Sequence, residues 1–254
     1  MNDLRLVPDR LVTTDIPIVR VERLDTRYAP RPWPFATARR VEIDRYFSAL
    51  QRAQPALWNG RVLLLHDHDI EGAVFRGAYL ETDFASFIAW RDWGFPDASV
   101  KNCFSAAALR GCDGAFLLGV MSAHTMNAGK IYFPAGTPDP GDIVGERVDL
   151  ARNLWRELAE ETGLTLADLV AEEGWFSVLD GARLAQVKIL RARETSAALR
   201  ARMRAHIAGQ REPELADVRV VRSAADFDPM MPLFVPAFLT HVWSTEAHDE
   251  APRI

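Results

Sequence analysis

Hydrophobic residues recur along the chain at two different spacings, which predicts a protein of mixed α and β structure. Short apolar runs bounded by Gly, Pro or Asp predict strands at 16–24, 61–66, 72–81, 103–110, 115–121, 131–133, 175–179, 183–191 and 218–221. Apolar positions at helical spacing predict helices at 37–53, 83–93, 149–162, 194–207 and 231–243. Because strands and helices follow each other in mixed order, the pattern favours an α/β or α+β core.

The order of these elements predicts three parts. Residues 1–98 would form a smaller N-terminal α+β accessory region, residues 99–243 the main domain, and residues 244–254 a C-terminal tail. Before the helix at 149–162 lies a loop rich in Gly, Pro and Asp, and we expect Asp149 and Gly163 to cap that helix. The run His66-Asp67-His68-Asp69 could ligate a metal, but it is more typical of a polar turn between strands.

Composition and charge narrow the class of partner. The formal net charge is -5, which argues against a protein that binds nucleic acid through bulk positive charge. The most apolar stretch, 229–243, is broken by three prolines and too short to cross a bilayer, and the first 15 residues lack the apolar core of a signal peptide. Cys103 and Cys112 are expected as free thiols. We expect a cytoplasmic protein with a small-molecule partner, and a homodimer is compatible with the sequence.

The segment at 156–164, Arg-Glu-Leu-Ala-Glu-Glu-Thr-Gly-Leu, holds the chemistry of most interest. At about 100° per residue on a helix, Glu157, Glu160 and Glu161 share an arc of roughly 100°. This arc borders the apolar face of the helix, so the three acids should lie at the edge of the core, where a cleft would be. Arg156 lies one turn from Glu160 and can steady its carboxylate.

Three carboxylates near the C-terminal end of one helix repel each other and meet the negative end of the helix dipole. A divalent cation would remove both conflicts, since hard cations such as Mg²⁺ prefer carboxylate oxygen. A solvated acidic face is the other interpretation, and the residues alone leave both open.

The same segment, preceded by Pro-Ala-Gly at 134–136, resembles the Nudix box. That box reads Gly, five residues, Glu, seven residues, Arg-Glu-hydrophobic, one residue, Glu-Glu, one residue, Gly-hydrophobic. The resemblance implies a Nudix-type α/β/α sandwich with a mixed sheet for the main domain, with the N-terminal α+β region added to it.

The loop of the box departs from the family pattern. Five residues after Gly136 comes Asp142, which is separated from Arg156 by 13 residues where the family has seven. The box therefore holds a six-residue insertion near 143–148. Either Asp142 or Glu146 could replace the family's loop Glu, and the insertion could shape the pocket or be a surface bulge.

Nudix enzymes hydrolyse a nucleoside diphosphate linked to another group, with Mg²⁺ or Mn²⁺ and an activated water. The resemblance implies that Glu157 and Glu161 are the main metal ligands and that Glu160 binds metal or positions water. It also implies that Arg156 orients the acids and that Ala135 supplies a backbone carbonyl ligand.

One acid outside the box often acts as base or ligand in this family. Glu214 is the first choice, because it precedes a strand expected beside the box, and Glu212 is the second; both could instead be solvated loop acids. The N-terminal layout is loosely similar to the branch that cleaves UDP-sugars. A coenzyme A diphosphatase, or a catalytically weak Nudix domain that senses a nucleotide, remains an alternative.

Overall fold

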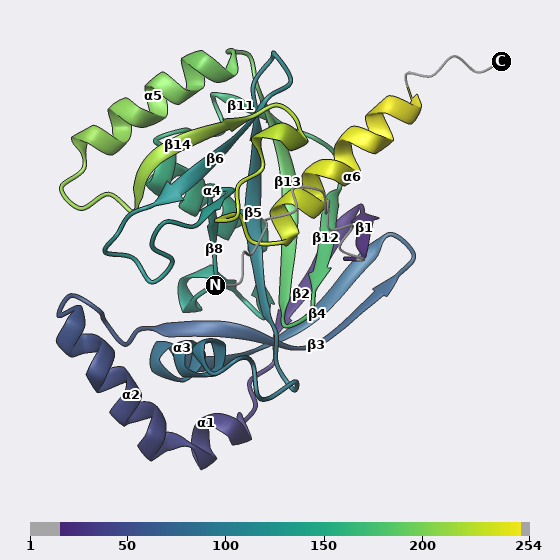
Figure 1. Cartoon of the computed structure of the whole chain (residues 1–254). Coiled ribbons are helices and arrows are strands. Elements are labelled where there is room, and N and C mark those ends of the chain that lie inside the picture. The colour runs from purple at the N-terminus through teal and green to yellow at the C-terminus, as the bar shows by residue number, and fades with distance from the viewer. Residues whose placement is uncertain (1–15, 250–254) are drawn as a thin grey trace, which may run out of the picture.

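The computed structural model describes residues 16–249, and its strands form two sheets (Figure 1). The main path of the nine-stranded sheet runs in the order β1 (Ile18–Val21), β12 (Trp175–Asp180), β13 (Arg183–Ala192), β5 (Asn102–Arg110), β6 (Phe116–Met121) and β14 (Leu215–Val221). Three short strands join it from the side: β11 (Leu169–Ala171), β7 (Ile131–Tyr132) and β8 (Ala135–Gly136). β13 and β5 pair in parallel, so the sheet is mixed.

The nine-stranded sheet is covered on both faces, which confirms the expected sandwich. Successive residues of β5 point to opposite faces: Cys103 belongs to the core under α4 (Leu150–Thr162) and α5 (Ser196–Gly209), and Phe104 to the core under α6 (Phe234–Asp249). We call this sheet with α4, α5 and α6 the large lobe.

Helix α4 begins and ends where the sequence predicts. The Asp149 carboxylate accepts a hydrogen bond from the Arg152 backbone N–H at 2.9 Å, and Gly163 ends the helix with a left-handed φ of 71°. Its buried apolar side chains anchor the helix on the sheet, and this anchoring fixes the direction in which its acids point.

The five-stranded sheet has the order β3 (Arg61–Glu71), β4 (Val74–Asp83), β2 (Arg23–Tyr28), β10 (Arg147–Val148) and β9 (Ile143–Val144). Helices α1 (Pro34–Ala38), α2 (Arg40–Ala53) and α3 (Phe84–Asp92) lie with it in the lower part of Figure 1. Leu64 packs in the core with α3, while its neighbours Leu63 and Leu65 pack into the core of the large lobe. This sheet with α1–α3 is the N-terminal lobe.

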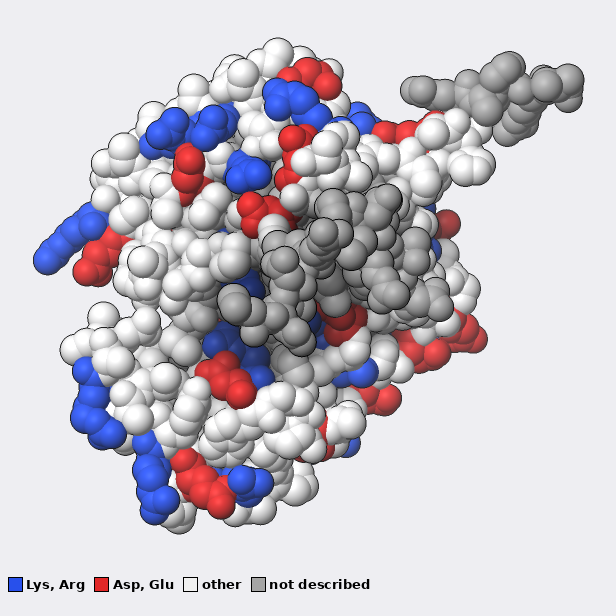
Figure 2. Space-filling view, in the orientation of Figure 1, with Lys and Arg blue, Asp and Glu red and all other residues white. Residues whose placement is uncertain are grey.

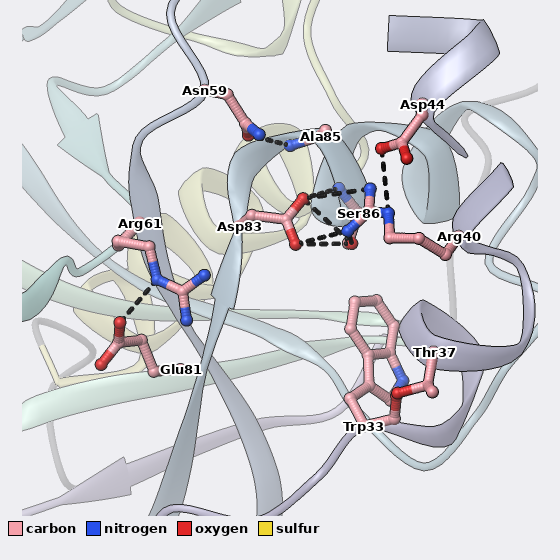
Figure 3. Close-up of polar contacts among 10 residues, drawn as sticks. All are labelled: Trp33, Thr37, Arg40, Asp44, Asn59, Arg61, Glu81, Asp83, Ala85 and Ser86. Atoms are coloured by element: carbon pink, nitrogen blue, oxygen red, sulfur yellow. Dashed lines mark hydrogen bonds and ion pairs between the residues drawn. The ribbon is translucent and has the colours of Figure 1, made fainter. Parts of the chain in front are cut away.

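Polar contacts hold the helices of the N-terminal lobe at their ends (Figure 3). Asp83 caps α3 by accepting a hydrogen bond from the Ser86 backbone N–H at 2.9 Å, and Arg40 of α2 lies 2.9 Å from the same carboxylate. Asn59 accepts a hydrogen bond from the Ala85 N–H at 2.8 Å. Each of these acids and amides has a partner, which is the usual state of polar groups inside a fold.

Each of the two sheets includes a strand from the part of the chain that forms the other lobe. β1, from the N-terminal part of the chain, pairs with β12 of the large sheet. In return, the insertion at 143–148 forms β9, a turn and β10, and β10 pairs with β2 of the smaller sheet. The Thr26 hydroxyl donates a hydrogen bond to the Val148 carbonyl at 2.6 Å. The insertion is therefore part of the N-terminal lobe's sheet, and the interpretation as a surface bulge is wrong.

Several local expectations need correction. The strand expected at 16–24 is divided into β1 and β2 at Glu22, and the run at 66–69 lies inside β3, because β3 pairs with β4 along almost its whole length. Helix α6 continues to Asp249, so the expected C-terminal tail begins inside a helix. Both cysteines are free, as expected. Within residues 16–249, no helix has the length and apolar character needed to cross a membrane.

Candidate active site

A cleft of about 1380 Å³ lies between the two lobes. Figure 2 shows a groove between the upper and lower parts of the molecule on the face in view. Box residues Ala135, Gly136 and Glu157 line the cleft from the large lobe, together with Glu212 and Glu214 from the loop before β14. The structure thus brings the box helix, the strand before it and the expected outside acids to one wall.

Glu161 is the most unusual acid in the site. It is 3% exposed, and neither carboxylate oxygen has a hydrogen-bond partner among the described residues. Burial raises its pKa well above the ordinary value, and the charges of Glu214 and Glu157 raise it further, while the nearby Ala135 N–H acts in the opposite direction. An unpaired buried carboxylate is costly, so a fold keeps one only where something else meets it.

Glu157 lies one turn before Glu161 and packs against Gly136. Any side chain at Gly136 would overlap the Glu157 carboxylate, so only a glycine fits here while Glu157 keeps this position. Burial raises the pKa of Glu157 to about 7, although the Arg156 guanidinium, 2.9 Å away, lowers it. Near neutral pH, whether Glu157 carries its negative charge therefore depends on a positive group nearby.

Glu214 lies at the surface of the cleft wall. Its side chain is exposed, yet the cleft walls around it partly remove it from water, and this burial raises its pKa. The charge of Glu160 raises the pKa further, and the charge of His124 lowers it. Its backbone carbonyl accepts a hydrogen bond from the Ser122 N–H at 2.8 Å, which ties the loop to the end of β6. Glu212 is exposed and lines the same cleft.

Asp142 and Glu146, the two candidates for the loop acid, do not line the cleft. Asp142 is fully buried, and one of its oxygens accepts hydrogen bonds from Arg156 at 3.1 Å and Asn153 at 3.0 Å. Glu146 is exposed in the turn between β9 and β10. Asp142 thus anchors the loop to α4 and positions Arg156, and Glu146 lies with the N-terminal lobe.

Glu160 differs from its two neighbours. Its side chain is 62% exposed, and its carboxylate lies 3.5 Å from Arg156, the pair expected at this spacing. Within residues 16–249, no three Asp, Glu, His or Cys side chains are arranged closely enough to hold a metal ion by themselves. Glu157 and Glu161 supply two carboxylates beside Ala135, which suits Mg²⁺, an ion that commonly takes one or two protein carboxylates and completes its shell with water and phosphate oxygens.

Comparisons with known proteins give matches at the level of structure. No family model matches the chain, and no curated protein matches its sequence. The solved structure of RenU, a Nudix hydrolase from M. smegmatis, is 17% identical, with 61% of this chain and 89% of that chain covered at a TM-score of 0.39. The putative Nudix hydrolase Tm1382 is 15% identical, with 73% and 99% covered at 0.43.

A third match is a bifunctional NMN adenylyltransferase/ADP ribose pyrophosphatase from Francisella tularensis, solved with AMP and a Mn ion. It is 16% identical, with 62% of this chain and 46% of that chain covered at a TM-score of 0.40.

Within the chain itself, the segment that resembles the Nudix box lies on strand β8 and helix α4, with Gly136 against Glu157. Its departure from the family pattern, the insertion, is the hairpin that joins the N-terminal lobe.

The structure adds one residue of the Nudix-box helix that the sequence interpretation missed. Asn153 is fully buried; it accepts a hydrogen bond from the Ser105 hydroxyl at 2.5 Å and donates to Asp142 at 3.0 Å and Glu157 at 3.5 Å. It therefore links the sheet, the box loop and the acid helix. Its position four residues before Glu157 was the available signal, because i and i+4 side chains lie on one helix face.

Tyr132 on β7 was also missed. Its hydroxyl accepts a hydrogen bond from the Asn127 amide at 2.9 Å. Burial raises its pKa, and the charges of Glu161 and Glu214 raise it further, so the hydroxyl keeps its proton at neutral pH. Nothing in the local sequence distinguishes Tyr132 from a core aromatic residue.

Proposed function

We propose that this protein is a Nudix-type hydrolase that cleaves the diphosphate bond of a nucleoside diphosphate linked to another group, with Mg²⁺ or Mn²⁺ as cofactor. The observation that carries the proposal is Glu161, a buried carboxylate with two unpartnered oxygens next to Glu157. A bound divalent cation would neutralise the diphosphate and lower the pKa of a water molecule. The chain's own residues then have separable tasks.

Glu157 and Glu161 would hold the cation, and Arg156 would fix the direction of Glu157. The Arg156 guanidinium contacts Glu157 at 2.9 Å and Asp142 at 3.1 Å, so the buried Asp142 keeps Arg156 in place. Charge-assisted contacts of this kind give geometric precision as well as energy. Glu160, at the exposed rim, would adjust the local charge and help to position water.

Glu214 is the residue we propose as general base. Its pKa is raised and its side chain is open to the cleft, so it is a stronger proton acceptor than an ordinary exposed carboxylate. The Tyr132 hydroxyl stays protonated beside these acids, and it can donate a hydrogen bond to a phosphate oxygen.

A nucleotide sugar is the substrate we favour within this class. The cleft of about 1380 Å³ exceeds the roughly 300–1,000 Å³ of pockets for drug-sized ligands, which leaves room for a nucleoside, a diphosphate and a further group. The layout of the N-terminal lobe and the lengthened box loop support the same choice.

The test is a substrate panel with Mg²⁺ that includes UDP-sugars, ADP-ribose, coenzyme A, dinucleoside polyphosphates and nucleoside triphosphates. We expect turnover of at least one diphosphate-linked compound to a nucleoside monophosphate and a second phosphorylated product. Tight binding of a nucleotide without turnover of any compound would contradict the hydrolase and favour a sensor.

A further inference from the structure

This inference rests on the proposed function and concerns the wall of the cleft opposite the acids. Four residues of α3 line the cleft, and they are spaced i, i+3, i+4 and i+7 along the helix: Phe84, Phe87, Ile88 and Arg91. This spacing places them on one face of the helix. Phe84 and Arg91 are partly exposed on this face, whereas Phe87 and Ile88 are 6% and 1% exposed and lie beneath it. The N-terminal lobe therefore presents to the cleft the Phe84 side chain and one cation, over an apolar floor.

Arg91 is connected across the cleft to the acid wall. Its Nη1 donates to the Asn127 side-chain carbonyl at 3.2 Å, and the Asn127 amide donates to the Tyr132 hydroxyl at 2.9 Å. The charges of Arg91 and Glu161 both affect the pKa of Tyr132, in opposite directions. The chain Arg91–Asn127–Tyr132 thus runs from α3 to the residues beside the Nudix box.

The environment of Arg91 suits an anionic ligand. Its side chain is 23% exposed, and its Nε lies 2.8 Å from Asp92. The contacts to Asp92 and Asn127 use Nε and one Nη, whereas a guanidinium carries five N–H donors in a planar fork. Arginine is the residue best suited to phosphate for this reason.

We propose that α3 forms the second wall of the substrate site, that Arg91 binds a phosphate oxygen of the nucleoside diphosphate, and that Phe84, supported from beneath by Phe87 and Ile88, contacts an uncharged part of the substrate. The N-terminal lobe is then part of the binding site and sets its specificity. Asn127 holds Arg91 in position, and its amide orientation directs the Tyr132 proton toward the acids and the ligand.

The experiment measures binding of the α,β-methylene analogues of ADP and UDP, which cannot be hydrolysed at the bridging position, by calorimetry with Mg²⁺. Arg91→Met should weaken the tighter of the two about tenfold, the size expected for loss of one charge-assisted hydrogen bond. Arg91→Lys keeps the charge but loses the planar fork, so its affinity should lie between that of the wild type and that of Arg91→Met. Arg45→Met removes an exposed arginine from α2 of the same lobe and should change nothing.

A latch between the lobes with no ligand contact would give a different pattern. In that case Asn127→Ala should weaken binding as much as Arg91→Met does, and the salt dependence of affinity should be equal in all variants. Under the proposal, Asn127→Ala has the smaller effect, and affinity falls less steeply with salt in Arg91→Met than in the wild type.

The failure of this inference is distinguishable from failure of the proposed function. If the wild type hydrolyses a panel compound and Arg91→Met binds the analogue with wild-type affinity, the role of Arg91 is wrong and the hydrolase stands. If the wild type binds neither analogue and hydrolyses nothing in the panel, both proposals are wrong.

Discussion

The acids of the N-terminal lobe and the buried acids of the cleft wall in the large lobe have opposite environments. In the N-terminal lobe, the pKa of Glu81 is lowered by its hydrogen bond with Arg61, and that of Asp83 is lowered because Arg40 and Ser86 outweigh its burial. In the large lobe, burial raises the pKa values of Glu157 and Glu161. The acids with lowered pKa values stabilise the fold in their charged form, whereas the buried acids with raised pKa values destabilise it when charged and mark the place where a ligand is needed.

The largest expected effect comes from removing one unpaired charge. Glu161→Gln keeps the shape of the side chain and loses the charge that would hold a cation, so turnover should fall by about a hundredfold or more. The metal-free variant should be more stable than the wild type by about 1–2 kcal/mol, because a buried repelling charge is gone. Steady-state kinetics and denaturant unfolding measure the two effects. Wild-type turnover in this variant would contradict the site.

Asp142 is a buried acid of the large lobe that, unlike Glu161, accepts hydrogen bonds from neighbouring side chains. Asp142→Ala removes one buried hydrogen-bond partner from Arg156 and one from Asn153, so the free energy of unfolding should fall by about 3 kcal/mol. Turnover should fall about tenfold in the folded protein, because Arg156 loses its anchor. Glu146→Ala, in the exposed turn of the inserted hairpin, is the matched control and should behave like the wild type. Loss of turnover in Glu146→Ala alone would show that the hairpin supplies the missing loop acid.

The sequence predicted the parts of this site that depend on local spacing. The caps of α4 follow from Asp149 and Gly163, and the burial of Glu161 follows from an acidic arc that borders the apolar face of the helix. The hairpin at 143–148 could not be predicted as part of the smaller sheet, because its pairing with β2 joins segments more than a hundred residues apart.

The same limit applies to the polar chain across the cleft. Arg91, Asn127 and Tyr132 come from a helix, a loop and a short strand, and none has a distinctive local motif. The run at 66–69 was misinterpreted for the opposite reason: its polar residues favour a turn locally, while pairing with β4 keeps them in a strand.

The pH dependence of stability should separate the buried cleft acid Glu157 from the acids with lowered pKa values. The pKa of Glu157 is raised from 4.5 to about 7, so the unfolded chain loses this proton first, and the metal-free protein should lose up to about 3 kcal/mol as pH rises from 4.5 to 7. Glu157→Gln should reduce this slope. The lowered pKa values of Glu81 and Asp83 act in the other direction, and their contribution is lost as pH falls below about 4. Equal slopes in the wild type and Glu157→Gln would contradict the assignment.

The smallest expected effect comes from the matched substitution in the N-terminal lobe. Glu81→Gln removes a partly exposed charge that pairs with Arg61 at 2.6 Å, and it should lower the free energy of unfolding by about 1 kcal/mol. Turnover should stay at the wild-type level, because Glu81 does not line the cleft. A gain in stability, as expected for Glu161→Gln, would remove the contrast between the lobes.

The most direct test of the cation site is a thermal unfolding series with increasing Mn²⁺. Because a ligand that binds only the folded state stabilises it by RT ln(1 + [L]/Kd), the Tm of the wild type should rise with Mn²⁺ concentration. We expect Glu81→Gln to show the same rise and Glu161→Gln to show almost none. A wild-type Tm that does not respond to Mn²⁺, or an equal rise in Glu161→Gln, would contradict the claim that Glu157 and Glu161 form a divalent-cation site.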